Sequence, residues 1–380
     1  MTENHMKTML AGCRVFGSPR RYIQGAGALG LLGVETLSLG NRATVICDSQ
    51  VRSFLEELVL SSLNSASVDS DIVEFDGEVV REAIHDLCEQ ISPTLPEVII
   101  ALGGGKTVDV GKAVADKLGA RLIVVPTLAS NDAPTSRAVV FYDRDHNLSG
   151  VERCQWNPDV ILVDTAVIAQ APERFLVAGI GDAIAKRFEA DASVRYERNN
   201  LHGGRVTQAG LCLASASYEV IRRDGLEACR AVRDGSPNQS LEAVVESCVL
   251  LAGLGFENSG LFLAHSLTRG LALFSQTQNF LHGELVAYGL LVQLTQEGRP
   301  LECLLDLINF YQSVGLPESL QALGLDRLSP SCLLRMAEAT LAAPYMEELR
   351  AQLQPAELVS YMVRLEQVST QKITPSATTQ

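Results

Sequence analysis

The stretch EVIIALGGGKT, residues 97–107, carries the clearest signal of the fold, because an apolar run leads directly into a glycine-rich turn. The run EVIIAL is rich in β-branched residues and has no polar face, which predicts a fully buried strand, and residues 108–118 follow it with a helical pattern. The same alternation continues on both sides, with strands expected at 43–47, 71–75, 121–125 and 159–163 and helices at 51–62 and 78–91. Apolar strands that alternate with helices indicate a parallel sheet covered on both faces.

The pattern changes at about residue 172, after which strand candidates become few. The helical stretches expected there are 173–190, 204–222, 241–254, 260–273, 282–296, 301–313, 330–341 and 355–367. We therefore predict an α/β domain over residues 1–168 and an all-α helical bundle domain over 169–368. Residues 369–380 are rich in Ser and Thr, which predicts a flexible tail.

Composition and charge narrow the class of protein. The chain has 380 residues, of which 47% are hydrophobic and 20% charged, so a large core is expected and wholesale disorder is excluded. The net charge of −14 disfavours nucleic acid or an anionic membrane surface as a partner, because phosphate binding needs clustered positive charge. No apolar run reaches the roughly 20 residues of a membrane span, residues 1–12 lack the apolar stretch of a signal peptide, and the nine cysteines form no CxxC pair. We expect a cytoplasmic protein with no nucleic-acid partner and no membrane partner.

The turn Gly103-Gly104-Gly105 is a candidate phosphate site. Consecutive glycines let a phosphate approach the backbone, and the N-terminus of the next helix supplies free N–H groups. The run is neither GxGxxG nor a Walker A loop, and a tight turn without a ligand is the alternative. Asp48 ends the strand at 43–47, where its carboxylate is suited to accept the ribose hydroxyls of NAD and to repel the 2′-phosphate of NADP. The alternative for Asp48 is a helix N-cap.

His265 lies on an otherwise apolar helical stretch, and Asp182 and His282 each stand at the start of one. One carboxylate and two imidazoles that converged from different helices would form a divalent-metal site with open positions, as a catalytic zinc requires. Each residue also has a structural interpretation: a helix cap for Asp182, and hydrogen-bonded core histidines for the other two. The spacing alone does not decide whether they meet.

Five segments, in order, carry a resemblance. They are GGGKTVDVGKA (103–113), VPTLASNDAPTS (125–136), GIGDAIAKRFEA (179–190), AHSLTRGL (264–271) and HGELVAYG (282–289). Together they resemble the glycerol dehydrogenases of the metal-dependent group III, or iron-containing, alcohol dehydrogenase family, over about residues 18–315. The resemblance implies a dehydroquinate synthase-like fold with an N-terminal dinucleotide-binding domain and a helical metal and substrate domain.

The resemblance also implies an activity and its residues. The activity is the reversible, NAD-dependent and zinc-dependent oxidation of a small polyol or vicinal diol, of the glycerol-to-dihydroxyacetone type, by a homo-oligomer, an octamer in the family. Zinc would bind Asp182, His265 and His282, and Asp132 would hold a substrate hydroxyl. The implied NAD-binding residues are Asp48, Gly103, Gly104, Gly105, Lys106, Thr107, Asp109, Thr127 and Ser130, with Ser136, Ala138 and Tyr142 at the nicotinamide half. Iron-using relatives carry a further histidine at the position of Lys186, so zinc is favoured.

Several residues depart from the family pattern. Thr268 and Arg269 replace a histidine and an asparagine, Leu285 replaces a lysine, and Arg137 stands at a position that is usually small. Three alternatives therefore stay open. They are a dehydrogenase of the same superfamily for a 2-hydroxy acid, glycerol 1-phosphate or another polyol; a dehydroquinate synthase-like lyase; and a binding protein without activity.

Overall fold

The computed structural model describes residue 10 and residues 12–143 and 148–373, which form two compact units. The α/β unit comprises Gly17–Leu176 and Glu227–Leu254; the helical unit comprises Val177–Leu226 with the described residues before 17 and after 254. The predicted domains, 1–168 and 169–368, are continuous segments, whereas both units are discontinuous. The segment 227–254 belongs to the α/β unit because its contacts lie there: Gln24 Nε2 donates to Glu242 Oε2 at 2.6 Å.

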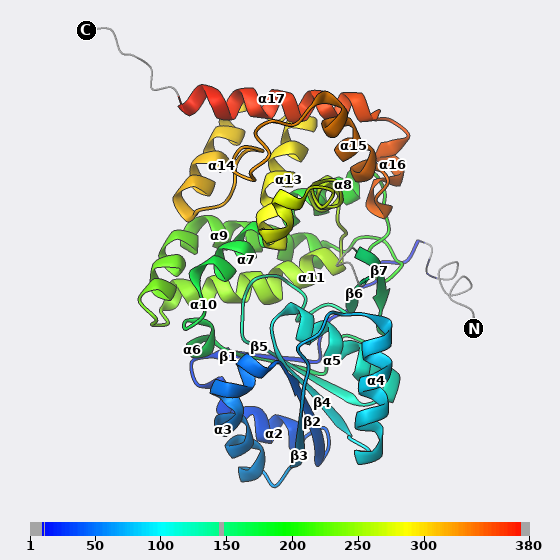
Figure 1. Cartoon of the computed structure of the whole chain (residues 1–380), viewed down its shortest axis with the longest axis vertical. Coiled ribbons are helices and arrows are strands. Elements are labelled where there is room, and N and C mark those ends of the chain that lie inside the picture. Colours follow the sequence, from blue (N-terminus) through cyan, green and yellow to red (C-terminus); the bar gives the residue numbers. More distant parts are fainter. Residues whose placement is uncertain (1–9, 11, 144–147, 374–380) are drawn as a thin grey trace. The chain divides into compact units, whose positions relative to one another are not determined.

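The α/β unit is built on a six-stranded, fully parallel sheet (Figure 1). In spatial order its strands are β1 (Arg21–Gly25), β8 (Val160–Asp164), β5 (Arg121–Pro126), β4 (Val98–Gly103), β2 (Arg42–Cys47) and β3 (Asp69–Glu74). In register, Val45 of β2 lies beside Ile100 of β4 and Ile72 of β3. The predicted fold class is confirmed, and the five predicted strands are β2, β3, β4, β5 and β8.

Helices cover both faces of this sheet. On one face, η1 (Ala28–Leu31), α2 (Leu32–Leu37) and α3 (Ser49–Ser65) pack on alternate strand residues such as Val45 and Ile100. On the other, α4 (Arg81–Ile91) and α5 (Gly105–Leu118) pack on the intervening residues, such as Ile46 and Ile99. A strand turns successive side chains to opposite faces, so continuous apolar strands are required here. The short elements η2 (Ser92–Thr94) and α6 (Thr165–Ile168) complete this part of the unit.

Three strands of the α/β unit were not among those predicted. β1 has the sequence RYIQG and is mostly half-buried at the sheet edge, so it lacks the apolar run that marks the central strands. β6 (Ala138–Tyr142) and β7 (Leu148–Arg153) form a separate antiparallel pair. β7 is largely exposed and polar, which is why its sequence carries no strand signal.

The helical unit contains the remaining long helices. Their bounds are α7 (Glu173–Ala183), α8 (Lys186–Arg195), α9 (Gln208–Arg233), α11 (Ala252–Glu257), α12 (Leu263–Leu271), α13 (His282–Gln296), α14 (Leu301–Val314), α15 (Pro330–Leu341), α16 (Glu347–Arg350) and α17 (Pro355–Ile373), with 3₁₀ turns η4 (Ser275–Asn279) and η5 (Pro344–Met346). The unit boundaries fall inside α7, α9 and α11. α17, red in Figure 1, packs against α13 and α15. The predicted flexible tail starts at 369, whereas α17 continues to Ile373; residues 374–380 lie outside the described residues.

One helical run joins α10 (Gln239–Glu246), the π-turn η3 (Ser247–Leu251) and α11. By length and composition alone, residues 239–257 are apolar enough to cross a membrane, with a mean hydropathy of 1.3. Their window is 61% buried inside the protein, as expected of a core helix. The π-turn exposes a backbone acceptor, and Thr135 Oγ1 donates to Val249 O at 2.9 Å.

Candidate active site

Three side chains from three helices meet in the helical unit. Asp182 comes from α7, His265 from α12, and His282 is the first residue of α13. One ligand atom from each lies within 4.8 Å of the others, and His265 Nε2 is 3.0 Å from Asp182 Oδ1. Asp182 and His265 are buried, whereas His282 is exposed. The structure therefore brings together the three predicted ligands, and one side of the cluster is open to solvent.

Two glycines beside the ligands allow this convergence. A Cβ on Gly283 would lie 1.8 Å from the carbonyl oxygen of Ala178 in α7, and a Cβ on Gly181 would lie 2.4 Å from the carbonyl oxygen of Gly283. No side-chain atom can lie this close to a carbonyl oxygen, so both positions require glycine. The glycines allow the backbones of α7 and α13 to approach each other next to Asp182 and His282. Close helix packing thus explains Gly181 and Gly283, each of which is adjacent in sequence to a ligand residue.

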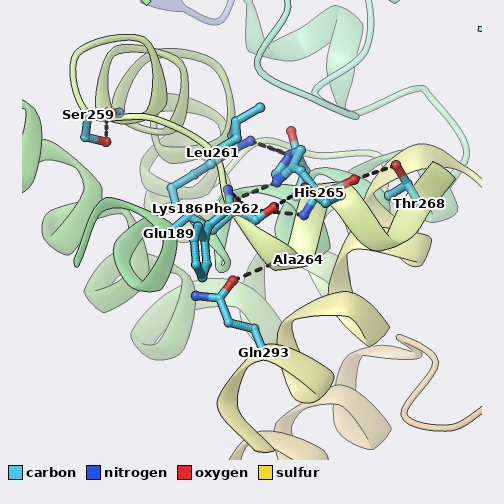
Figure 2. Close-up of polar contacts among 12 residues, drawn as sticks. Lys186, Glu189, Ser259, Leu261, Phe262, Ala264, His265, Thr268 and Gln293 are labelled. Carbon is cyan, nitrogen blue, oxygen red and sulfur yellow. Dashed lines mark hydrogen bonds and ion pairs between the residues drawn. The ribbon is translucent and has the colours of Figure 1, made fainter. Parts of the chain in front are cut away.

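Glu189 orients His265, and sequence reasoning did not identify this role. Its Oε2 lies 2.6 Å from His265 Nδ1 (Figure 2), and its Oε1 accepts from the backbone N–H groups of Phe262 and His265 at 2.8 and 3.1 Å. The N-cap position of α12 is held by Phe262, which has no polar side chain, so Glu189 caps the helix and fixes its histidine together. A carboxylate on Nδ1 leaves Nε2 directed at Asp182, the usual support for a metal-binding histidine.

The sequence held only a weak signal for Glu189. It follows Asp182 by seven residues, close to two helical turns, which predicts the same face if the helix is continuous. A turn at 184–185 separates α7 from α8, but both side chains remain in the cluster. Glu189 has no exposed surface, and a buried carboxylate needs partners.

The electrostatics of the cluster keep both of its buried carboxylates ionised. Burial by itself raises the pKa of Asp182, but the Lys186 ammonium and the His265 ring lower it well below its usual range. Burial likewise raises the pKa of Glu189, and the His265 ring more than offsets this. Burial lowers the pKa of His265, whereas the Glu189 carboxylate raises it to about 9. Both carboxylates are therefore ionised at neutral pH, and a metal that binds Nε2 must displace any proton there.

Lys186 enters the same cluster. Its Nζ lies 2.9 Å from Asp182 Oδ1 and 2.9 Å from His265 Nε2, and 4.9 Å from the centroid of the Phe256 ring. The side chain is 1% exposed. The three donors fit a divalent metal by type and spacing, but the ammonium contacts two of them directly.

Three of the four positions that depart from the family pattern lie within four residues of a ligand in sequence. Thr268 Oγ1 donates to the carbonyl oxygen of His265 at 2.7 Å (Figure 2), so this side chain is used inside α12. Arg269 is half-buried in the last turn of that helix, and Leu285 is buried in the first turn of α13. Arg137 is half-buried in the α/β unit.

The predicted cofactor turn lies in the α/β unit, where β4 ends and α5 begins. Gly104 is the N-cap of α5 and offers no side chain to the first N–H groups, which leaves them available to an anion. The Thr127 N–H donates to Gly103 O at 3.1 Å, which places the loop after β5 beside the turn. Thr107 is buried, and the exposed Lys106 pairs with Glu78 at 2.7 Å.

Two predicted cofactor aspartates already have structural partners. Asp48 Oδ1 accepts from Val51 N at 2.7 Å, so it is the N-cap of α3 at the carboxyl end of β2. Both oxygens of the buried Asp109 are engaged, one with Lys112 Nζ at 3.0 Å and one with Val140 N at 2.9 Å. Asp109 thus holds β6 against α5. The remaining predicted positions are Ser130, half-buried after β5; Asp132 and Ser136, buried in the following loop; and Ala138 and Tyr142, the two ends of β6.

Comparison with known proteins agrees with the fold. Residues 19–165 match the family described as iron-containing alcohol dehydrogenase. A glycerol dehydrogenase of Thermotoga maritima is 40% identical over 321 residues, which cover 84% of this chain and 87% of that protein. The chain belongs to the iron-containing alcohol dehydrogenase family, and the resemblance carried by the five segments is confirmed.

Two further relatives extend the comparison. A glycolaldehyde reductase of Halobacterium salinarum is 37% identical over 86% of this chain and 89% of its own length. The crystal structure of glycerol dehydrogenase from Schizosaccharomyces pombe gives a TM-score of 0.91 at 32% identity, over 95% of this chain and 92% of that one.

Proposed function

We propose that this protein catalyses the reversible, NAD-dependent oxidation of a small polyol or vicinal diol, of the glycerol type, with a divalent metal at Asp182, His265 and His282. The observation that carries the proposal is the convergence of these donors, with His265 oriented by Glu189. Relatives named glycerol dehydrogenase, similar over most of the chain, support the substrate class. The resemblance further supports a homo-oligomer, an octamer. The net charge of −14 supports our proposal of a cytoplasmic protein with no nucleic-acid and no membrane partner.

Different residues of the chain have different roles in the proposed reaction. When bound, the metal supplies Lewis-acid polarisation of the substrate oxygen and NAD supplies the hydride acceptor. Asp182, His265 and His282 hold the metal, and Glu189 keeps Nε2 of His265 directed at it. The N–H groups at the start of α5 bind the pyrophosphate of NAD. We assign zinc rather than iron because Lys186 stands where iron-using relatives carry a further histidine.

Asp132 is our candidate for selecting the substrate. A carboxylate that accepts a hydrogen bond from the second hydroxyl favours a diol over a simple alcohol, and such a bond contributes about 1.5–3 kcal/mol, or about tenfold to more than a hundredfold. The departures at Thr268, Arg269 and Leu285 indicate that the pocket differs from that of typical relatives. The glycolaldehyde reductase relative favours a second candidate, the reduction of a small hydroxyaldehyde by the same residues.

The test is a substrate panel with purified, zinc-loaded protein, NAD and NADH. We expect glycerol or 1,2-propanediol to produce NADH, and Asp132→Ala to reduce glycerol turnover about tenfold more than turnover of 2-propanol. Asp71→Ala, at an exposed position in β3, is the control and should change neither. Activity with only a 2-hydroxy acid or glycerol 1-phosphate would replace the polyol assignment. Turnover of a dehydroquinate synthase-type substrate without net NADH would indicate the lyase.

A further inference from the structure

Lys186 lies where the charge of a metal ion would be needed. Its Nζ is 2.9 Å from Asp182 Oδ1 and 2.9 Å from His265 Nε2, and these two atoms are 3.0 Å apart (Lys186, Glu189 and His265 are labelled in Figure 2). An ammonium only donates hydrogen bonds, so Lys186 and a metal both need Nε2 of His265 in its unprotonated form, and the two compete for the same atom.

The distances leave little room for a second cation. A metal bonded to both Asp182 Oδ1 and His265 Nε2 at ordinary lengths of about 2.0–2.2 Å would lie within about 4 Å of this Nζ position. Like charges at such a separation in a buried site repel strongly, because the local dielectric screens them poorly.

The charge count leads to the same conclusion. Asp182 and Glu189 supply two buried negative charges to the cluster. A divalent cation balances both carboxylates by itself, whereas a divalent cation together with the ammonium leaves a buried excess of positive charge, which is unfavourable.

We propose that the Lys186 ammonium and the divalent metal are alternative occupants of one site. In the metal-free protein Lys186 closes the site and keeps Asp182 and His265 paired; to bind, the metal must displace the lysine side chain. The centre therefore binds its metal more weakly than the same three ligands would without Lys186. This inference rests on the proposed three-ligand centre, but not on the polyol substrate.

The first experiment measures zinc affinity by competition with a chromogenic chelator at constant pH. Lys186→Met and Lys186→Gln remove the ammonium, and both should bind zinc about tenfold or more tightly than the unaltered protein. Lys186→Arg keeps a positive charge and should not gain affinity. Lys117→Met removes the same charge from an exposed position in α5, and should leave zinc affinity unchanged. Unchanged or weaker zinc affinity in both Lys186→Met and Lys186→Gln overturns the proposal.

The second experiment uses the unaltered protein, so it does not depend on any variant folding. Lysine acetylation followed by peptide mass spectrometry compares protein with and without bound Co²⁺, whose visible absorption reports occupancy. Lys186 should be protected without metal and become reactive when cobalt binds, while the exposed Lys106 and Lys117 react equally in both states. Cobalt binding with Lys186 still protected overturns the proposal. Neither experiment uses substrate, so a failure of the polyol assignment leaves both results intact.

Discussion

Two buried lysine–aspartate pairs, one in each unit, show how surroundings determine the role of the same two side chains. Lys112 Nζ lies 3.0 Å from Asp109 Oδ1, and Lys186 Nζ lies 2.9 Å from Asp182 Oδ1; both lysines are 1% exposed. Lys112 also donates to a backbone carbonyl, Ala138 O, at 2.7 Å. Lys186 instead contacts His265 Nε2. The first pair therefore fastens β6 to α5, whereas the second includes two atoms suited to a metal ion.

Replacing the two aspartates in parallel tests this difference most strongly. Asp182→Asn should lose most of the metal and lower activity about a thousandfold or more, since a direct ligand matters more than the orienting groups around it. His265→Ala and His282→Ala should behave in the same way. The Asp109→Asn variant should keep the metal bound at Asp182, His265 and His282. Metal analysis of the purified variants decides, and one equivalent of zinc kept in all three ligand variants would contradict the assignment.

The lysine of the α/β unit gives the next largest effect. Lys112→Met leaves the Asp109 carboxylate buried without its ammonium, and should lower the free energy of unfolding by about 3–5 kcal/mol. Zinc affinity should not rise, in contrast to Lys186→Met. Chemical denaturation of the metal-free protein measures the loss, and Lys117→Met is the exposed control. A Lys112→Met protein as stable as the unaltered protein would contradict the structural role of the Lys112–Asp109 pair.

Replacing Glu189 tests whether a residue that does not bind the metal itself contributes to metal affinity. Glu189→Gln keeps the size of the side chain but weakens its hold on His265 Nδ1, so zinc affinity should fall about 10- to 100-fold while the fold is retained. Chelator competition measures the affinity. Glu82→Gln, at an exposed position in α4, should have no effect. Zinc affinity equal to that of the unaltered protein would reduce Glu189 to a helix cap.

Replacing Asp48 should have the smallest effect on stability. It tests whether this residue of the α/β unit binds NAD or only caps α3. Asp48→Gly removes the N-cap contact with Val51 at a loss of a few tenths of a kcal/mol, and Asp48→Ala about 1 kcal/mol. If the carboxylate also contacts the ribose, both variants should lose their preference for NAD over NADP. Steady-state rates with both cofactors separate the two roles, since a cap alone would leave the preference intact.

Much of the fold was predictable from local patterns. Continuous apolar runs such as residues 97–102 marked the central strands, and helical periodicity marked most of the C-terminal helices. The edge strand β1 and the exposed strand β7 were missed because their burial is partial, so the apolar signal is weak. The turn between α7 and α8 was missed because the periodicity continues through it.

Local sequence patterns indicated five of the strands and most of the C-terminal helices in their order, the glycine turn at 103–105, and three candidate ligands of the right chemical types. The folded structure was needed to see that Asp182, His265 and His282 meet, that Glu189 orients His265, and that Lys186 contacts two of the three donors. The reason is that residue type and periodicity report only on the helix or strand that contains them. The site instead depends on backbone approaches between elements distant in sequence, such as Gly181 of α7 against Gly283 of α13.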